Sequence, residues 1–112
     1  MVYTNKYRAK NSQPQVLEFN LTATDDLTQL YDQVEIVLCA ELNSGFGRNL
    51  DALYDVLTGG FGLIYNSNTN TDDIIYNINV YNSKLLSPKI LKIFKAAGEY
   101  NKEINSINIL FY

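Results

Sequence analysis

The sequence contains no histidine and no tryptophan, and there is a single cysteine among its 112 residues. Without histidine the chain lacks the usual general base, the commonest metal ligand and any catalytic triad that depends on an imidazole. The one cysteine, Cys39, cannot form an intrachain disulfide, and its apolar neighbours indicate a small buried side chain. We therefore expect neither a metal site nor a cofactor.

Long apolar runs are also absent from the sequence. No segment approaches the about 18 consecutive apolar residues that a transmembrane helix requires. Residues 1–15 lack the apolar core of a signal peptide. These absences predict a cytoplasmic protein that does not contact a membrane.

Positive charge is scarce as well. The chain has 9 Lys and Arg against 12 Asp and Glu, which gives a net charge of −3 at pH 7. Proteins that bind nucleic acid usually present a basic surface, so this balance argues against direct binding of DNA or RNA. An acidic chain is better suited to a basic protein partner.

The chain does contain enough apolar residues for one folded domain. Hydrophobic residues make up 46% and charged residues 19%, which is typical of a globular chain. Residues 1–14 are polar, and we expect a tail or a short edge strand there. Residues 15–112 are then predicted to form a single domain.

Three segments have the pattern of β-strands: residues 15–21, 74–81 and 104–112. Residues 61–65 are apolar enough for a further strand, which would pair with the segment from residue 74 in a hairpin. The alternative is an irregular excursion of the chain. Helical patterns separate the three main segments, and parallel strands need such crossover connections. We predict an α/β fold in which a small three-stranded parallel sheet packs against three or four helices.

Two long helical patterns lie between the predicted strands. Apolar residues recur every three or four positions over residues 27–42, which predicts a helix of about four turns. We expect Thr24 to cap its N-terminus and Glu35 to lie on its solvent side. A last helix is predicted to begin after Ser87 and to stop at Gly98.

The segment GRNLDALYDVLTGG, residues 47–60, predicts a short helix with two unlike sides. Asn49 is a suitable N-cap, and Gly59 is a suitable terminator. Asp51 and Asp55 lie one turn apart on one side of this helix. The leucines lie on another side: Leu50, Leu53 and Leu57.

From residue types alone, Asp51 and Asp55 are most simply explained as solvated surface acids. Like charges one turn apart cost a helix about 0.2–0.5 kcal/mol. The helix macrodipole compensates this for Asp51 in the first turn, but less for Asp55 in the second.

The same segment resembles the signature of the barstar family, intracellular inhibitors of barnase-type ribonucleases. Twelve positions match in register without a gap: Gly47, Asn49, Leu50, Asp51, Ala52, Leu53, Tyr54, Asp55, Val56, Leu57, Thr58 and Gly59. The resemblance implies the barstar fold, a three-stranded parallel sheet with helices around it. It also implies one-to-one inhibition, in which this helix and the loop before it fill the active-site cleft of a basic ribonuclease.

The resemblance also assigns roles to single residues. Asp55 is expected to enter the phosphate site of the nuclease, with Asp51 supporting it nearby. Tyr54 stands where the family has an aromatic, and Phe46 aligns with an aromatic of the preceding loop. The implied partner-binding residues are therefore Phe46, Gly47, Asp51, Tyr54, Asp55, Thr58 and Gly59.

The chain departs from the family pattern at several positions. Arg48 stands where barstar itself carries an acid, which would bring a positive charge close to Asp51. Gly60 stands where barstar has a tryptophan, and Ala96 aligns near an interface acid of the last helix. Residues 61–73 look like an insertion, and residues 82–87 are too few for the family's third helix.

Two functions remain open at this point. The first is an intracellular ribonuclease inhibitor that acts through the helix of residues 49–58. The alternative is a protein of the same fold whose helix binds a different, non-nuclease partner. We do not expect an enzyme, because Asp51 and Asp55 share one exposed helical side, whereas catalytic carboxylate pairs usually face each other across a cleft.

Overall fold

The fold is built on a three-stranded parallel sheet. The computed structural model describes residues 15–67, 74–104 and 106–112. Strands β1 (Gln15–Thr22), β2 (Ile74–Tyr81) and β3 (Ile107–Phe111) lie in the order β1-β2-β3. Gln15 lies opposite Ile74 in the first pair, and Tyr76 opposite Ile107 in the second. The predicted α/β class and the small parallel sheet are confirmed.

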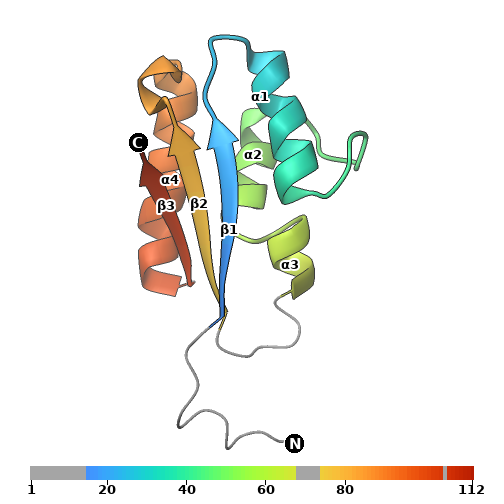
Figure 1. Ribbon diagram of the computed structural model, residues 1–112, viewed down its shortest axis with the longest axis vertical. Helices are drawn as coiled ribbons and strands as arrows, with labels where there is room; N and C mark the ends of the chain where they lie inside the picture. Colours follow the sequence, from blue (N-terminus) through green and yellow to red (C-terminus); the bar gives the residue numbers. More distant parts are fainter. Residues whose placement is uncertain (1–14, 68–73, 105) are drawn as a thin grey trace, which may run out of the picture.

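Helices connect the strands. The described part of the chain contains α1 (Leu27–Gln33), the π-helical turn η2 (Val34–Leu38), α2 (Leu50–Leu57), α3 (Leu63–Ser67), the 3₁₀ turn η4 (Ser83–Leu85) and α4 (Pro88–Ile104). In Figure 1 the sheet stands in front, and α2 and α4 lie behind it. The inner face of the sheet and these helices share one core, which contains Leu21, Leu53, Leu57, Ile78, Val80 and Phe94, each at most 1% exposed.

The outer face of the sheet carries a group of polar side chains at its centre, which is unusual because parallel sheets are normally covered on both faces. Asn79 donates from Nδ2 to Glu18 Oε1 at 2.8 Å and to Asn20 Oδ1 at 2.9 Å. Asn77 donates to Glu18 Oε2 at 3.1 Å, and Asn108 donates to Asn77 Oδ1 at 3.0 Å. This ladder of amides lets the face meet water without leaving buried polar groups unpaired.

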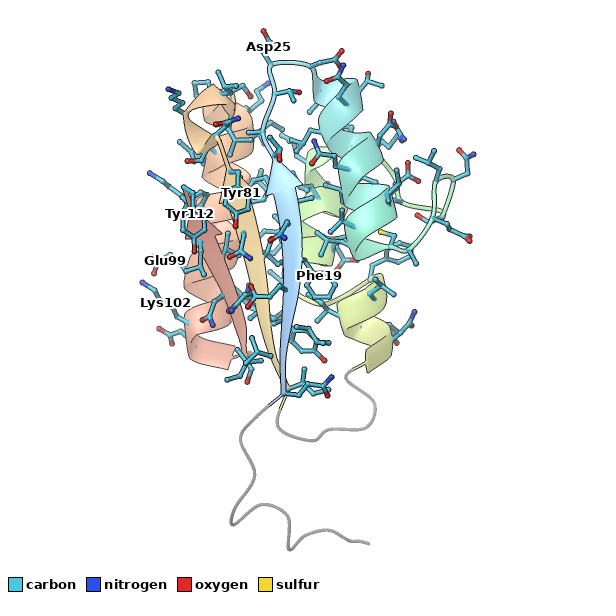
Figure 2. The ribbon with its side chains drawn as sticks, viewed as in Figure 1. Phe19, Asp25, Tyr81, Glu99, Lys102 and Tyr112 are labelled. Atoms are coloured by element: carbon cyan, nitrogen blue, oxygen red, sulfur yellow. The ribbon has the colours of Figure 1, made fainter. Side chains whose placement is uncertain are left out.

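Two tyrosines continue this face beyond the amide ladder. The rings of Tyr81 and Tyr112 stack with centroids 5.0 Å apart, as Figure 2 shows near the C-terminal end of the sheet. Both side chains are exposed, Tyr81 by 41% and Tyr112 by 60%. Each ring therefore covers part of the other's apolar surface while keeping its hydroxyl in water.

The first helix differs from its prediction at both ends. Asp26 caps it, because its carboxylate accepts from the amides two and three residues later, whereas Thr24 Oγ1 accepts from the Asp26 amide. The helical segment ends at Leu38 and not at Leu42, because Ala40 takes a φ of 78°, which a helix cannot continue. Leu42 is accordingly 47% exposed, although it continues the apolar spacing.

The strand alternative for residues 61–65 is wrong, because the helix α3 occupies this part of the chain. Ile64 on α3 is 1% exposed and belongs to the core, and a short apolar run does not by itself distinguish a buried strand from a buried helix. The rest of the expected insertion, residues 68–73, lies outside the described residues, as does the expected tail at residues 1–14.

The last helix is longer than predicted. Gly98 does not stop α4, which continues to Ile104. A Cβ at Gly98 would meet no other atom within 4 Å, so no contact requires glycine there. Ser83–Leu85 form one 3₁₀ turn in the link that looked too short for a helix of the family's kind.

A buried amide joins α4 to the end of α2. Asn101 is fully buried, and its Nδ2 donates to the carbonyl oxygen of Leu57 at 3.0 Å. That carbonyl belongs to the last turn of α2, where no intrahelical donor is available. The bond therefore stabilises the C-terminal end of α2 against α4.

We expect Asn101→Ala to destabilise the protein by about 1–3 kcal/mol, because it leaves a buried carbonyl without its donor. The free energy of unfolding from urea titration measures this loss. Lys92→Ala, on the exposed side of α4, is the control and should change stability by less than about 0.5 kcal/mol. Equal losses in the two variants would contradict this role of Asn101.

Candidate partner-binding site

The predicted ends of α2 are confirmed. Asn49 has an extended backbone, and its Oδ1 accepts from the Ala52 amide at 2.8 Å. Gly59 follows the helix with a φ of 83°, a conformation that glycine adopts without steric cost. The helix is therefore fixed to eight residues, and its sides are fixed with it.

The two aspartates of α2 point to solvent. Asp51 and Asp55 are both exposed, and no Lys or Arg in the described ranges forms an ion pair with either carboxylate. Leu53 and Leu57, on the other side of the helix, are completely buried. The structure thus separates a core side from an acidic side, as the spacing predicts.

The Asp55 carboxylate lies directly over Gly60. A Cβ added to Gly60 would come within 2.2 Å of Asp55 Oδ1 and within 3.0 Å of its Cγ. Any residue other than glycine at this position would therefore displace the Asp55 side chain. The Gly60 amide also donates to the Asp55 carbonyl at 2.8 Å, which holds the two residues together.

An open hollow of about 670 Å³ separates the exposed sides of α2 and α4, and it is lined by Leu50, Asp51, Ala52, Tyr54, Asp55, Ile93 and Ala96. Tyr54 lies beside this hollow and meets Tyr100 of α4 edge-on, with ring centroids 6.2 Å apart. The floor is apolar, and the acids come from α2.

Of the α4 residues at this surface, the sequence indicated Ala96 but not Ile93 or Tyr100. Ile93, Ala96 and Tyr100 are spaced by three and four residues, so they form one stripe of the helix. This stripe lies next to the buried one that contains Phe94 and Ala97. The spacing could have identified it, but nothing in the sequence shows that it faces Tyr54.

Other predicted site residues contribute less exposed surface. Phe46 is only 7% exposed and packs edge-on against Tyr31 at 5.5 Å, so its ring belongs to the core. Thr58 donates its hydroxyl to the Tyr54 carbonyl at 2.9 Å. Gly47 is exposed in the loop before α2. The structure therefore brings Asp51, Tyr54 and Asp55 together, and it places Phe46 beneath the loop as an anchor.

The surroundings of Arg48 and Glu35 differ from those expected. Arg48 forms ion pairs with Asp32, at 2.5 Å, and with Glu35, and none with Asp51. Glu35, expected on the solvent side of the first helix, is 1% exposed. Its carboxylate accepts from Arg48 Nε at 2.9 Å and from the Ser44 amide at 3.1 Å, so its burial is compensated by hydrogen bonds.

These contacts shift the acidity of both groups. Burial raises the pKa of Glu35, but the hydrogen bonds from Arg48 and Ser44, together with the charge of Arg48, outweigh this and hold the pKa below its ordinary value of 4.5. The hydrogen bonds to Asp32 and Glu35 raise the pKa of Arg48. Both groups are therefore charged at neutral pH.

Because the pKa of Glu35 is lowered in the folded state, its contribution to stability is present above its unfolded value and is lost as pH falls through the folded value. We expect Glu35→Gln to unfold more easily at neutral pH and to lose less additional stability than the native protein between about pH 5 and about pH 2. Urea unfolding across this range measures the effect. Parallel pH profiles of the two proteins would contradict it.

The family model described as barstar (barnase inhibitor) matches residues 14–105. The chain belongs to the barstar family. Among the curated proteins, no individual sequence matches significantly. The barstar family consists of inhibitors and not enzymes, and the match includes α2, α4 and the loop between η2 and α2.

The described residues contain neither a metal-ion cluster nor a membrane-spanning helix. In residues 15–67, 74–104 and 106–112, no three His, Cys, Asp or Glu side chains are placed to hold a metal ion. Over the same ranges, no helix is both long enough and apolar enough to cross a membrane. The exposed side of α2 is the candidate site of this barstar-family chain.

Proposed function

We propose that this protein inhibits a basic ribonuclease by inserting the exposed side of α2 and the loop before it into the active-site cleft, one inhibitor to one nuclease. The observation that supports this most is the pair Asp51 and Asp55, exposed and without an ion-pair partner in the described chain, in a member of the barstar family. The family match supports an inhibitor of barnase-type ribonucleases but names no particular target.

The chemistry of this surface fits such a target. A ribonuclease cleft presents cations to the phosphates of RNA, and free carboxylates can occupy those positions. The net charge of −3 favours association with a basic protein. Tyr54 and Tyr100 add large, partly apolar contacts beside the acids, and such residues are common at the centres of interfaces.

A different partner is the second candidate, and one observation favours it. On the α4 side of the hollow stand Ile93 and Ala96, so this half of the surface is apolar where barstar carries an acid. A partner that is less basic, or not a nuclease, would suit this half better. Barnase is therefore an informative probe, because its binding would depend on the acidic half of the surface.

We expect the protein to inhibit RNA cleavage by barnase and Asp55→Ala to weaken binding by about 2–5 kcal/mol, because truncation leaves a buried cation of the nuclease without its partner. Inhibition constants from RNA-cleavage assays measure this. Glu99→Ala removes another exposed acid, which lies on α4 beside Lys102, and should have little effect. Equal effects of the two substitutions would overturn the assignment of Asp55. If the native protein does not inhibit barnase, the different partner described above becomes the favoured function.

Gly60→Ala tests the position of the Asp55 carboxylate. Gly60 has no positive φ, so alanine should preserve the fold, but its Cβ must displace Asp55 Oδ1. We expect affinity for barnase to fall about tenfold, which is about 1.4 kcal/mol. Gly98→Ala is the matched control, since its Cβ meets nothing within 4 Å. Unchanged affinity in Gly60→Ala would show that the observed position of Asp55 is not required.

A further inference from the structure

We propose that Glu35 and Arg48 are positioning residues, which hold the loop of residues 43–49 in the conformation that binds the partner. This inference rests on the proposed function, because it assumes that α2 and the loop before it meet the nuclease. It assigns Arg48 to the support of the site and not to its electrostatic surface.

A single buried carboxylate closes this loop. Glu35, on η2, is 1% exposed. Its Oε2 accepts from the amide of Ser44 at 3.1 Å and from the Ser44 hydroxyl at 3.3 Å. Its Oε1 accepts from Arg48 Nε at 2.9 Å and from a second guanidinium nitrogen. The two ends of the segment 44–48 are therefore held by one side chain.

The loop backbone explains why such a restraint is needed. Asn43 has a φ of 61° and Arg48 a φ of 53°, values that residues other than glycine rarely adopt. Gly45 lies between them with a φ of 96°. Backbone of this kind persists only where the surroundings fix it. The guanidinium of Arg48 reaches both Asp32 and Glu35, which fixes the residue directly before the N-cap of α2.

The positive charge of Arg48 is balanced by Asp32 and Glu35. Asp32 and Glu35 carry two negative charges against its one positive charge, so the group remains negative overall. Arg48 therefore does not neutralise Asp51, although the two residues are only three apart. A purely electrostatic role and a positioning role consequently predict opposite effects when Arg48 is replaced.

Arg48→Met distinguishes the two roles, with Lys102→Met as the matched control. Each substitution removes one positive charge and changes the net charge from −3 to −4. If only charge mattered, both variants would bind barnase at least as tightly as the native protein. The positioning role predicts that Arg48→Met binds about tenfold more weakly, which is about 1.4 kcal/mol, and that Lys102→Met does not.

Two controls distinguish a loss of stability from a loss of positioning: the temperature of the measurement and a second variant. Affinities are compared at a temperature at which circular dichroism shows every variant fully folded. Arg48→Lys keeps the charge but cannot form the forked contact to two carboxylates. We expect it to recover only part of the lost affinity. Native affinity in Arg48→Met, or full recovery in Arg48→Lys, would overturn the role of the guanidinium.

Hydrogen exchange on the free protein tests the inference without any nuclease. Replacing Arg48 leaves Glu35 buried without its cation, so we expect its carboxylate to turn to water and the Ser44 amide to exchange about tenfold faster. The Leu53 amide, which donates to the Asn49 carbonyl at 2.9 Å inside α2, should exchange as before. Unchanged exchange at Ser44 would overturn the positioning role, whereas failure of the native protein to bind barnase would overturn only the proposed function.

Discussion

Burial of the leucine side of α2 is the constraint on which the candidate site depends. The helix has only eight residues, which is too short for stability in water on its own. Leu53 and Leu57 are completely buried, and Asn101 of α4 binds the Leu57 carbonyl, so tertiary contacts fix the rotation of the helix about its axis. With that rotation fixed, Asp51 and Asp55 can only face solvent.

The one-sided sheet follows from the same packing. In Figure 1, α2 and α4 lie behind the sheet. The hydrogen-bonded side chains of Glu18, Asn77 and Asn79 lie on its outer face. The polar ladder makes it possible for a parallel sheet to be covered by helices on one face alone. The proposed partner surface and the sheet surface therefore lie on different sides of the molecule.

Local patterns predicted the parts of the fold that carry strong local signals. The strands at 15–21 and 74–81 and the capped helix α2 agree with their patterns, because alternation, β-branched residues and an Asn cap act over a few residues. The extent of the first helix and the structure of residues 61–65 were wrong. Both depend on contacts with distant segments, such as the packing of Ile64 into the core.

The candidate site shows the same division. The common side of Asp51, Tyr54 and Asp55 follows from helical spacing, but the burial of Phe46 and the approach of Tyr100 depend on tertiary packing. Glu35 is the clearest case. It lies one turn after the buried Tyr31, so spacing allowed burial, yet a carboxylate is buried only where donors are available. The donors come from Arg48 and Ser44, nine or more residues away in the chain.

The departures from the family pattern therefore do not have equal consequences. Arg48 is neutralised by Asp32 and Glu35, so it does not weaken the acidic side of α2. Gly60 provides the space that the Asp55 carboxylate occupies. Ala96 is different, because it leaves the α4 side of the hollow apolar. If the surface binds a nuclease, the part of the partner that faces α4 should present apolar groups, and the part that faces α2 should present cations.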